Sequence, residues 1–139
     1  MEEIVLTQWN GDMSFNADID GHILTMDSSA EFGGKNLGPR PKPLLLAALA
    51  ACTGMDVVSI LGKMKIEMDK FDIKVIGDTT EEHPKYYHKI HVIYEFWGKD
   101  LPAGKIEKAI NLSRDKYCSV NWMLKEAAEM TWEMKLNQG

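Results

Sequence analysis

The chain has 139 residues, 45% of them hydrophobic and 27% charged, with a formal net charge of −5 at pH 7; this composition is typical of a single soluble domain spanning residues 1–139. The acidic balance, without a run of Lys and Arg, argues against a nucleic-acid binder. The N-terminal residues lack the pattern of a secretory signal, and the longest apolar run, Pro43 to Cys52, is about half of the roughly 20 residues that span a bilayer, so we expect a cytoplasmic protein that does not bind membranes.

Three strands are predicted in the first part of the chain. Asn10-Gly11 and Asp20-Gly21 are turn signals between alternating segments, which is typical of β-hairpins. The expected strands cover residues 3–9, 13–19 and 22–26. Together they predict an antiparallel meander.

A long loop and an apolar helix follow. The loop, residues 28–40, is rich in glycine and is long for a compact domain, and such loops often carry function. Pro41 and Pro43 indicate a helix start, because the first amides of a helix have no partner. From Leu44 to Val58 apolar residues cover nearly every side, so we expect a helix buried on all sides. A small chain has difficulty surrounding such a helix, which favours a partner chain.

The rest of the chain predicts more strands and two helices. Ser119 is the expected N-cap of a short helix that ends at Ala128. The other expected elements are strands over residues 71–76, 87–97 and 130–136 and a helix over residues 101–113. The resulting order, β-β-β-α-β-β-α-α-β, describes an α+β fold. Four large side chains are expected in the core, or else around an apolar ligand pocket: Met55, Met64, Trp122 and Met123.

The two cysteines are the candidate redox residues. In the cytoplasm, disulfides are usually transient, catalytic or sensing. Cys52 lies in mid-helix and is either a small core residue or a nucleophile; the helix dipole does not help there, so a cation such as Arg40 or Lys42 would have to stabilise the thiolate. Cys118 precedes a helix whose first amides can stabilise a thiolate, so it is a resolving or attacking thiol, or a packed core residue.

Asp56 and the histidines are further candidates. Asp56 lies one helical turn after Cys52 on the same face. It is either a proton acceptor or a buried carboxylate that pairs with another group, and its charge would raise a thiol pKa. His88 and His91 fall on opposite faces of a strand, and neither cysteine has a nearby Cys or His, so we predict no metal and no other cofactor.

Two segments carry a family resemblance. GPRPKPLLLAALAACTGMDVVSIL at residues 38–61 and KYCSVNWMLKEA at residues 116–127, in this element order, resemble the OsmC/Ohr family (osmotically inducible protein C and organic hydroperoxide resistance proteins), and its OsmC-like subgroup most. The resemblance implies an intertwined homodimer with two active sites at its interface, and thiol-dependent reduction of hydroperoxides, often organic, in a stress response. By position, Cys52 would attack the peroxide and Cys118 would resolve the sulfenic acid as a disulfide, with an external dithiol as reductant.

The chain departs from the family pattern in two places. The best-known members carry a Glu at the start of the central helix, where this chain has Pro43, and an Arg near the start of the second strand, at about Met13. That pair holds the thiolate and orients the peroxide; here Arg40 and Asp56 are the predicted substitutes. Two alternatives stay open: a protein that binds a small apolar molecule in the dimer pocket, and a redox sensor that forms the disulfide without efficient turnover.

Overall fold

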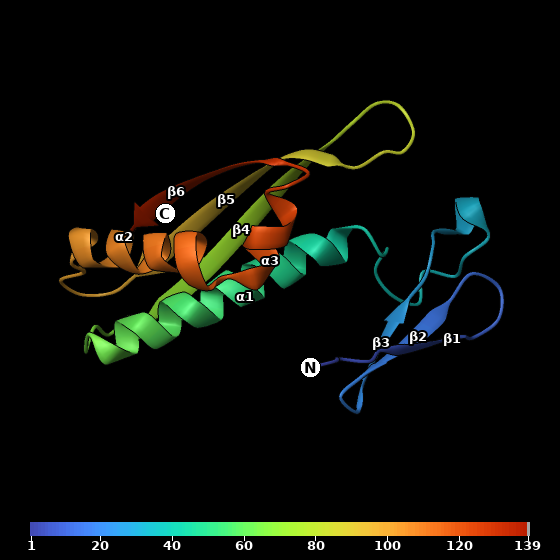
Figure 1. Cartoon of the computed structure of the whole chain (residues 1–139), viewed down its shortest axis with the longest axis horizontal. Coiled ribbons are helices and arrows are strands. Elements are labelled where there is room, and N and C mark those ends of the chain that lie inside the picture. Colours follow the sequence, from blue (N-terminus) through green and yellow to red (C-terminus); the bar gives the residue numbers. More distant parts are fainter. Residues whose placement is uncertain (139) are drawn as a thin grey trace. The chain divides into compact units, whose positions relative to one another are not determined.

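The computed structural model describes residues 1–138 and confirms the predicted α+β fold (Figure 1). The elements are β1 (Leu6–Trp9), β2 (Phe15–Ile19), β3 (His22–Met26), a 3-10 turn (Ala30–Phe32), α1 (Pro43–Lys63), β4 (Lys70–Thr79), β5 (Tyr87–Trp97), α2 (Ala103–Leu112), a π turn (Ser113–Tyr117), α3 (Ser119–Leu124) and β6 (Glu129–Leu136). The chain divides into two compact units, residues 1–45 and residues 46–139.

The first unit is built on an antiparallel sheet with strand order β1-β2-β3. Gly11 and Gly21 adopt positive φ angles of 92° and 84°, so both predicted turns are confirmed. The first strand is shorter than predicted: its pairing begins with Leu6 opposite Asp18, close to the end of β2.

The Asp27 carboxylate organises the loop that follows β3. It accepts hydrogen bonds from the backbone N–H groups of Ser28 at 2.7 Å, Lys35 at 3.0 Å and Leu37 at 3.1 Å, and the residue is only 3% exposed. Burial opposes ionisation, but the three N–H groups and the charge of Arg40 outweigh it and lower the pKa of Asp27. The long predicted loop is therefore ordered around one buried charge.

We expect this loop to make the protein sensitive to acid. Because the pKa of Asp27 lies below its ordinary value of 3.8, the carboxylate contributes stability that is present above that value and lost as the pH falls through the lower folded-state pKa. Asp27→Asn should lower the urea midpoint at neutral pH and flatten its fall in acid. Urea unfolding between about pH 3 and pH 7 measures this, with exposed Glu31→Gln as the control. Parallel profiles for Asp27→Asn and the unchanged chain would contradict it.

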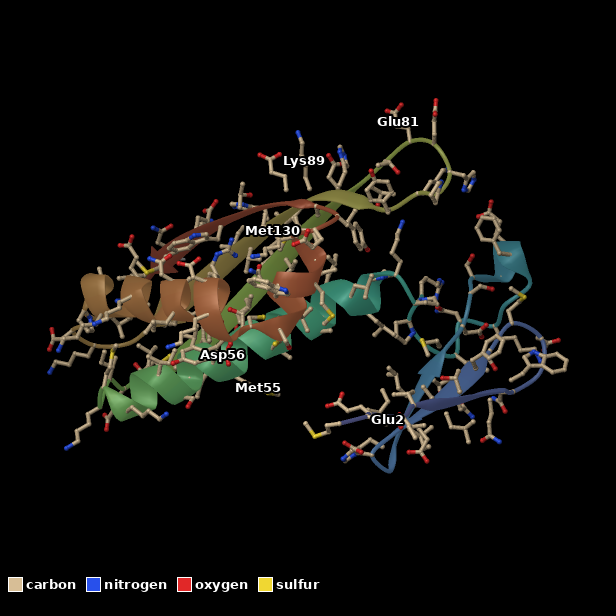
Figure 2. All side chains as sticks on the ribbon, in the orientation of Figure 1. Glu2, Met55, Asp56, Glu81, Lys89 and Met130 are labelled. Carbon is tan, nitrogen blue, oxygen red and sulfur yellow. The ribbon has the colours of Figure 1, made fainter. Side chains whose placement is uncertain are left out.

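The second unit is an α+β layer with strand order β4-β5-β6. The central strand β5 pairs antiparallel with β4 and parallel with β6, and its predicted bounds are confirmed. In Figure 2 Lys89 points away from the helices, whereas Met130 lies between the sheet and the helices. The buried core joins the inner face of the sheet to α1 and α2 through Leu49, Val57, Leu61, Ile90, Val92, Tyr94, Phe96, Ile106, Ala109 and Ile110.

Within one chain the central helix α1 is buried on one side only, and its cover by a partner chain stays a prediction. Its buried residues follow one stripe: Leu49, Thr53, Gly54, Val57 and Leu61. Met55 is 72% exposed and lies on the side of α1 away from the sheet (Figure 2). Among the described residues, α1 is long and apolar enough to cross a membrane by length and composition only, a property that core helices of soluble proteins share.

Two expectations about packing were wrong. Trp122 and Met123 do not line the core, since they are 61% and 63% exposed on α3; Met64 does pack against it. Cys118, not Ser119, is the N-cap of α3, because its sulfur accepts the Asn121 N–H, and α3 ends at Leu124. The prediction chose Ser119 because serine is a preferred N-cap residue. The π turn before the helix ends one residue earlier and so makes Cys118 the cap.

Candidate functional site

The second unit brings Cys52 and Cys118 together. Cys52 comes from the middle of α1 and is half-buried; Cys118 comes from the junction of the π turn and α3 and is 3% exposed. The Cys52 side chain is within hydrogen-bonding reach of the Cys118 thiol, and its Sγ lies 4.0 Å from Ser119 Oγ. Both cysteines are free. The geometry is that of a reduced dithiol with one accessible and one covered sulfur.

The environment of Cys118 keeps its thiol protonated. Burial is the largest influence and raises the pKa; the Asn121 N–H at 3.4 Å opposes it, and Cys52 and Asp56 raise it further, to about 11. The expected stabilisation of a thiolate by the helix amides is therefore outweighed by burial. Because a thiol attacks peroxide only as the thiolate, Cys118 is poorly suited to the first attack at neutral pH.

Asp56 lies beside the thiol pair, on the face of α1 that the sequence predicted, and is held in place. Ser113 Oγ donates a hydrogen bond to Asp56 Oδ2 at 2.8 Å. Thr53 Oγ1 lies 2.8 Å from both Ser113 Oγ and Tyr94 OH. The carboxylate is thus the end of a buried chain of hydroxyl groups, whereas sequence reasoning left it either as a proton acceptor or as a paired structural group.

A small pocket opens over Cys118. It has a volume of about 250 Å³ and is lined by Arg114, Asp115, Lys116, Tyr117, Cys118, Ser119, Trp122 and Met123. Lys125 Nζ lies 3.7 Å from the Trp122 ring centroid, a cation–π contact that covers one side of the ring. The exposed Trp122 and Met123 therefore form one apolar side of the pocket over Cys118, in agreement with the alternative prediction that they line a pocket, and charged residues of the π turn line the other side.

Arg40 belongs to the first unit. Its Nη1 donates to Asn36 Oδ1 at 2.8 Å and to the Gly38 carbonyl at 3.1 Å. It lines an apolar pocket of about 630 Å³ whose other walls include Met13, Phe15 and Phe32. Its predicted role toward Cys52 stays a prediction.

The histidines form polar pairs on the sheet. His88 Nε2 lies 3.2 Å from Asp78 Oδ2, and His91 bonds to both Thr131 and Glu133 at 2.7 Å. Within residues 1–138, no group of three His, Cys, Asp or Glu side chains is placed to hold a metal ion.

The fold and the facing thiols define a class of α+β dithiol proteins, and comparisons identify the family. The model of the OsmC-like protein family matches residues 33–133, and the chain belongs to this family. Protein YhfA of Escherichia coli K12 is 34% identical over 111 residues, which cover 80% of each chain. A hypothetical protein from Aquifex aeolicus VF5, known from its crystal structure, is 30% identical, covers 99% of each chain and has a TM-score of 0.83.

A more distant structure shares the fold alone. The organic hydroperoxide resistance protein OhrB of Bacillus subtilis is 21% identical, with a TM-score of 0.65 over 97% of this chain and 98% of its own.

Sequence reasoning missed three residues of the site: Thr53, Ser113 and Tyr94. Each is a polar group at a position where a pattern of buried residues predicts an apolar one. A polar residue in a buried pattern is a signal that the sequence does carry. That these three residues bond to one another depends on how α1, β5 and the π turn pack.

Proposed function

We propose that this protein reduces hydroperoxides through a two-thiol cycle, most readily organic ones. The observation that carries the proposal is the meeting of the chain's two cysteines, one half-exposed and the other buried and protonated. Family membership supports it, as does the fold shared with the organic hydroperoxide resistance protein OhrB of Bacillus subtilis.

The cycle has three balanced steps. The Cys52 thiolate attacks the terminal oxygen of ROOH, the O–O bond breaks, and with one proton an alcohol and a Cys52 sulfenic acid result. Cys118 then attacks the Cys52 sulfur as it gives up its proton to the sulfenic hydroxyl group, the S–O bond breaks, and a disulfide and one water result. An external dithiol in the cytoplasm reduces the disulfide and is itself oxidised.

Hydroperoxide consumption by the purified protein with excess dithiol tests this function. We expect catalytic turnover of an organic hydroperoxide such as cumene hydroperoxide, and slower turnover of hydrogen peroxide, because Tyr117, Trp122 and Met123 give the pocket over Cys118 an apolar side. Consumption of a single equivalent would instead support the redox sensor, and no reaction with either peroxide would contradict both redox functions.

A second copy of the chain is the proposed cover for α1. Met55 and Val58 are exposed beside an apolar groove of about 580 Å³ that Phe71 and Ile73 also line. Within the family resemblance this face belongs to a homodimer. Met55→Glu should therefore yield monomers in sedimentation equilibrium, because a dimer would bury the charge. Ile76→Glu, on the exposed face of β4, is the control and should leave the mass unchanged. A monomeric parent protein would overturn the proposal.

Binding of an apolar ligand is the second candidate function. The 630 Å³ pocket of the first unit favours it, because apolar side chains such as Met13, Phe15 and Phe32 line it together with polar groups that include Arg40 and Asp27. Native mass spectrometry of freshly purified protein should then reveal a bound small molecule that is lost in Arg40→Ala. Ligand-free spectra of protein that turns over peroxide would leave the thiol cycle as the better function.

A further inference from the structure

A continuous chain of hydroxyl groups runs through the core of the second unit to the thiol pair. Tyr94 OH, Thr53 Oγ1 and Ser113 Oγ are linked in sequence at 2.8 Å each, and Ser113 Oγ reaches Asp56 Oδ2 at 2.8 Å. The three hydroxyl-bearing residues are at most 1% exposed. A buried hydroxyl group without a hydrogen-bond partner destabilises the fold, so a buried chain in which every hydroxyl is bonded indicates a specific role.

The protons of this chain all point the same way. Ser113 donates its single proton to the Asp56 carboxylate. Ser113 then accepts from Thr53, and Thr53, having used its own proton, accepts from Tyr94. The Tyr94 oxygen keeps free lone pairs for a donor.

Arg114 is the cation at that end of the chain. Its guanidinium lies 5.8 Å from the Trp132 ring centroid on β6, and its charge opposes the rise that burial causes in the pKa of Tyr94. The chain therefore starts at a cation and ends at the Asp56 carboxylate. It joins the two charges through three hydroxyl groups, and hydrogen bonds aligned in this way strengthen one another.

The same two residues of the π turn hold Cys118 through their backbone. The Ser113 carbonyl accepts the Cys118 N–H at 2.7 Å, and the Arg114 carbonyl accepts from Asn121 Nδ2 at 3.0 Å. Asn121 N–H in turn donates to the Cys118 sulfur at 3.4 Å. One turn thus connects the hydroxyl chain to the second thiol.

We propose that Ser113 is a positioning residue for the thiol pair: through the chain from Arg114 to Asp56 it holds the Asp56 carboxylate beside Cys118, and this carboxylate adds to the effect of burial that keeps the second thiol unreactive until Cys52 has been oxidised. This inference deepens the proposed two-thiol cycle and rests on it. A protonated Cys118 neither attacks peroxide nor becomes over-oxidised. It reacts when the Cys52 sulfenic acid offers a hydroxyl leaving group that takes its proton.

Several groups face Cys118, and the experiment isolates one of them. The ionisable or charged neighbours are Cys52 and Asp56 from α1, Tyr94 from β5, and Arg114, Asp115, Lys116 and Tyr117 from the turn. In a Cys52→Ser background the remaining thiol is Cys118, so its alkylation by iodoacetamide reports its thiolate fraction at each pH. Removing the Asp56 charge changes that fraction without requiring peroxide turnover.

Asp56→Asn in this background should move the alkylation profile to lower pH by about half a unit, which is roughly threefold faster alkylation near pH 8. Ser113→Ala should shift it the same way by releasing Asp56, and Ser113→Thr, which keeps a hydroxyl, should restore the parent profile. Asp56→Asn combined with Ser113→Ala should react no faster than Asp56→Asn alone, because Ser113 acts through the carboxylate.

Matched controls separate positioning from stability. Asp72→Asn removes an exposed carboxylate of β4, and Ser59→Ala removes an exposed hydroxyl of α1. Profiles of Asp56→Asn and Ser113→Ala that coincide with these controls would overturn the proposal, as would a Ser113→Thr profile that follows Ser113→Ala. If the parent protein does not turn over peroxide but the alkylation profiles shift as described, the proposed function is wrong and the positioning role of Ser113 stands.

Discussion

Replacing Cys52 with serine is expected to remove hydroperoxide turnover almost completely, lowering kcat/KM by roughly a thousandfold or more. Serine is close to cysteine in size, so the packing of α1 is kept, but its hydroxyl is a far weaker nucleophile and cannot form a sulfenic acid. Peroxide consumption with excess dithiol measures the loss. The half-exposed position of Cys52 beside Ser119 makes it the thiol that an incoming peroxide can reach.

Cys118→Ser is the matched control for this prediction. It should still react with one equivalent of peroxide, because the attacking thiol is intact, and mass spectrometry should then find an added oxygen on Cys52 or its adduct with a sulfenic-acid trap. The parent protein should instead lose two hydrogens as the disulfide forms. If Cys52→Ser keeps the first reaction and Cys118→Ser loses it, the order of the two thiols is reversed.

The fold could be predicted well because its local signals agree with its packing. The Asp20-Gly21 sequence predicts the hairpin of β2 and β3, and the β-branched and aromatic residues predict the bounds of β5. Both predictions work because turn chemistry and strand preference act over a few residues. The end of α3 could not be predicted in this way. The helix is short and follows a π turn, so its boundaries depend on tertiary contacts.

The residues of the candidate site also differ in how well the sequence predicts them. The two cysteines and Asp56 stand out in the sequence because their chemistry is unusual in an apolar helix or at a helix start. Thr53, Ser113 and Tyr94 do not stand out, since each is an ordinary residue until the packing of three elements places Thr53 Oγ1 2.8 Å from both Ser113 Oγ and Tyr94 OH. The pKa of Cys118 was also misjudged, because placement at a helix start predicts a low value whereas burial, which depends on the whole core, raises it.

Phe96→Ala should destabilise the protein by about 3–5 kcal/mol, a large part of the roughly 5–15 kcal/mol that holds a typical domain folded. Phe96 is 0% exposed on the central strand, and its ring stacks on Phe71 with centroids 4.4 Å apart and 7° between planes. Truncation leaves a cavity that the flanking strands cannot close and removes the stacking contact. Phe32→Ala is the control; that ring is 70% exposed, so its loss should cost less than about 0.5 kcal/mol.

Urea unfolding under reducing conditions measures both changes, and a cost below about 1 kcal/mol for Phe96→Ala would contradict the assigned core. Phe96→Leu then separates stability from chemistry. It keeps most of the volume, should cost less than about 1.5 kcal/mol, and leaves the hydroxyl chain of the neighbouring Tyr94 untouched. Peroxide turnover and Cys118 alkylation should be unchanged in Phe96→Leu at temperatures where it is folded, because the sheet supports the thiol pair without taking part in its chemistry.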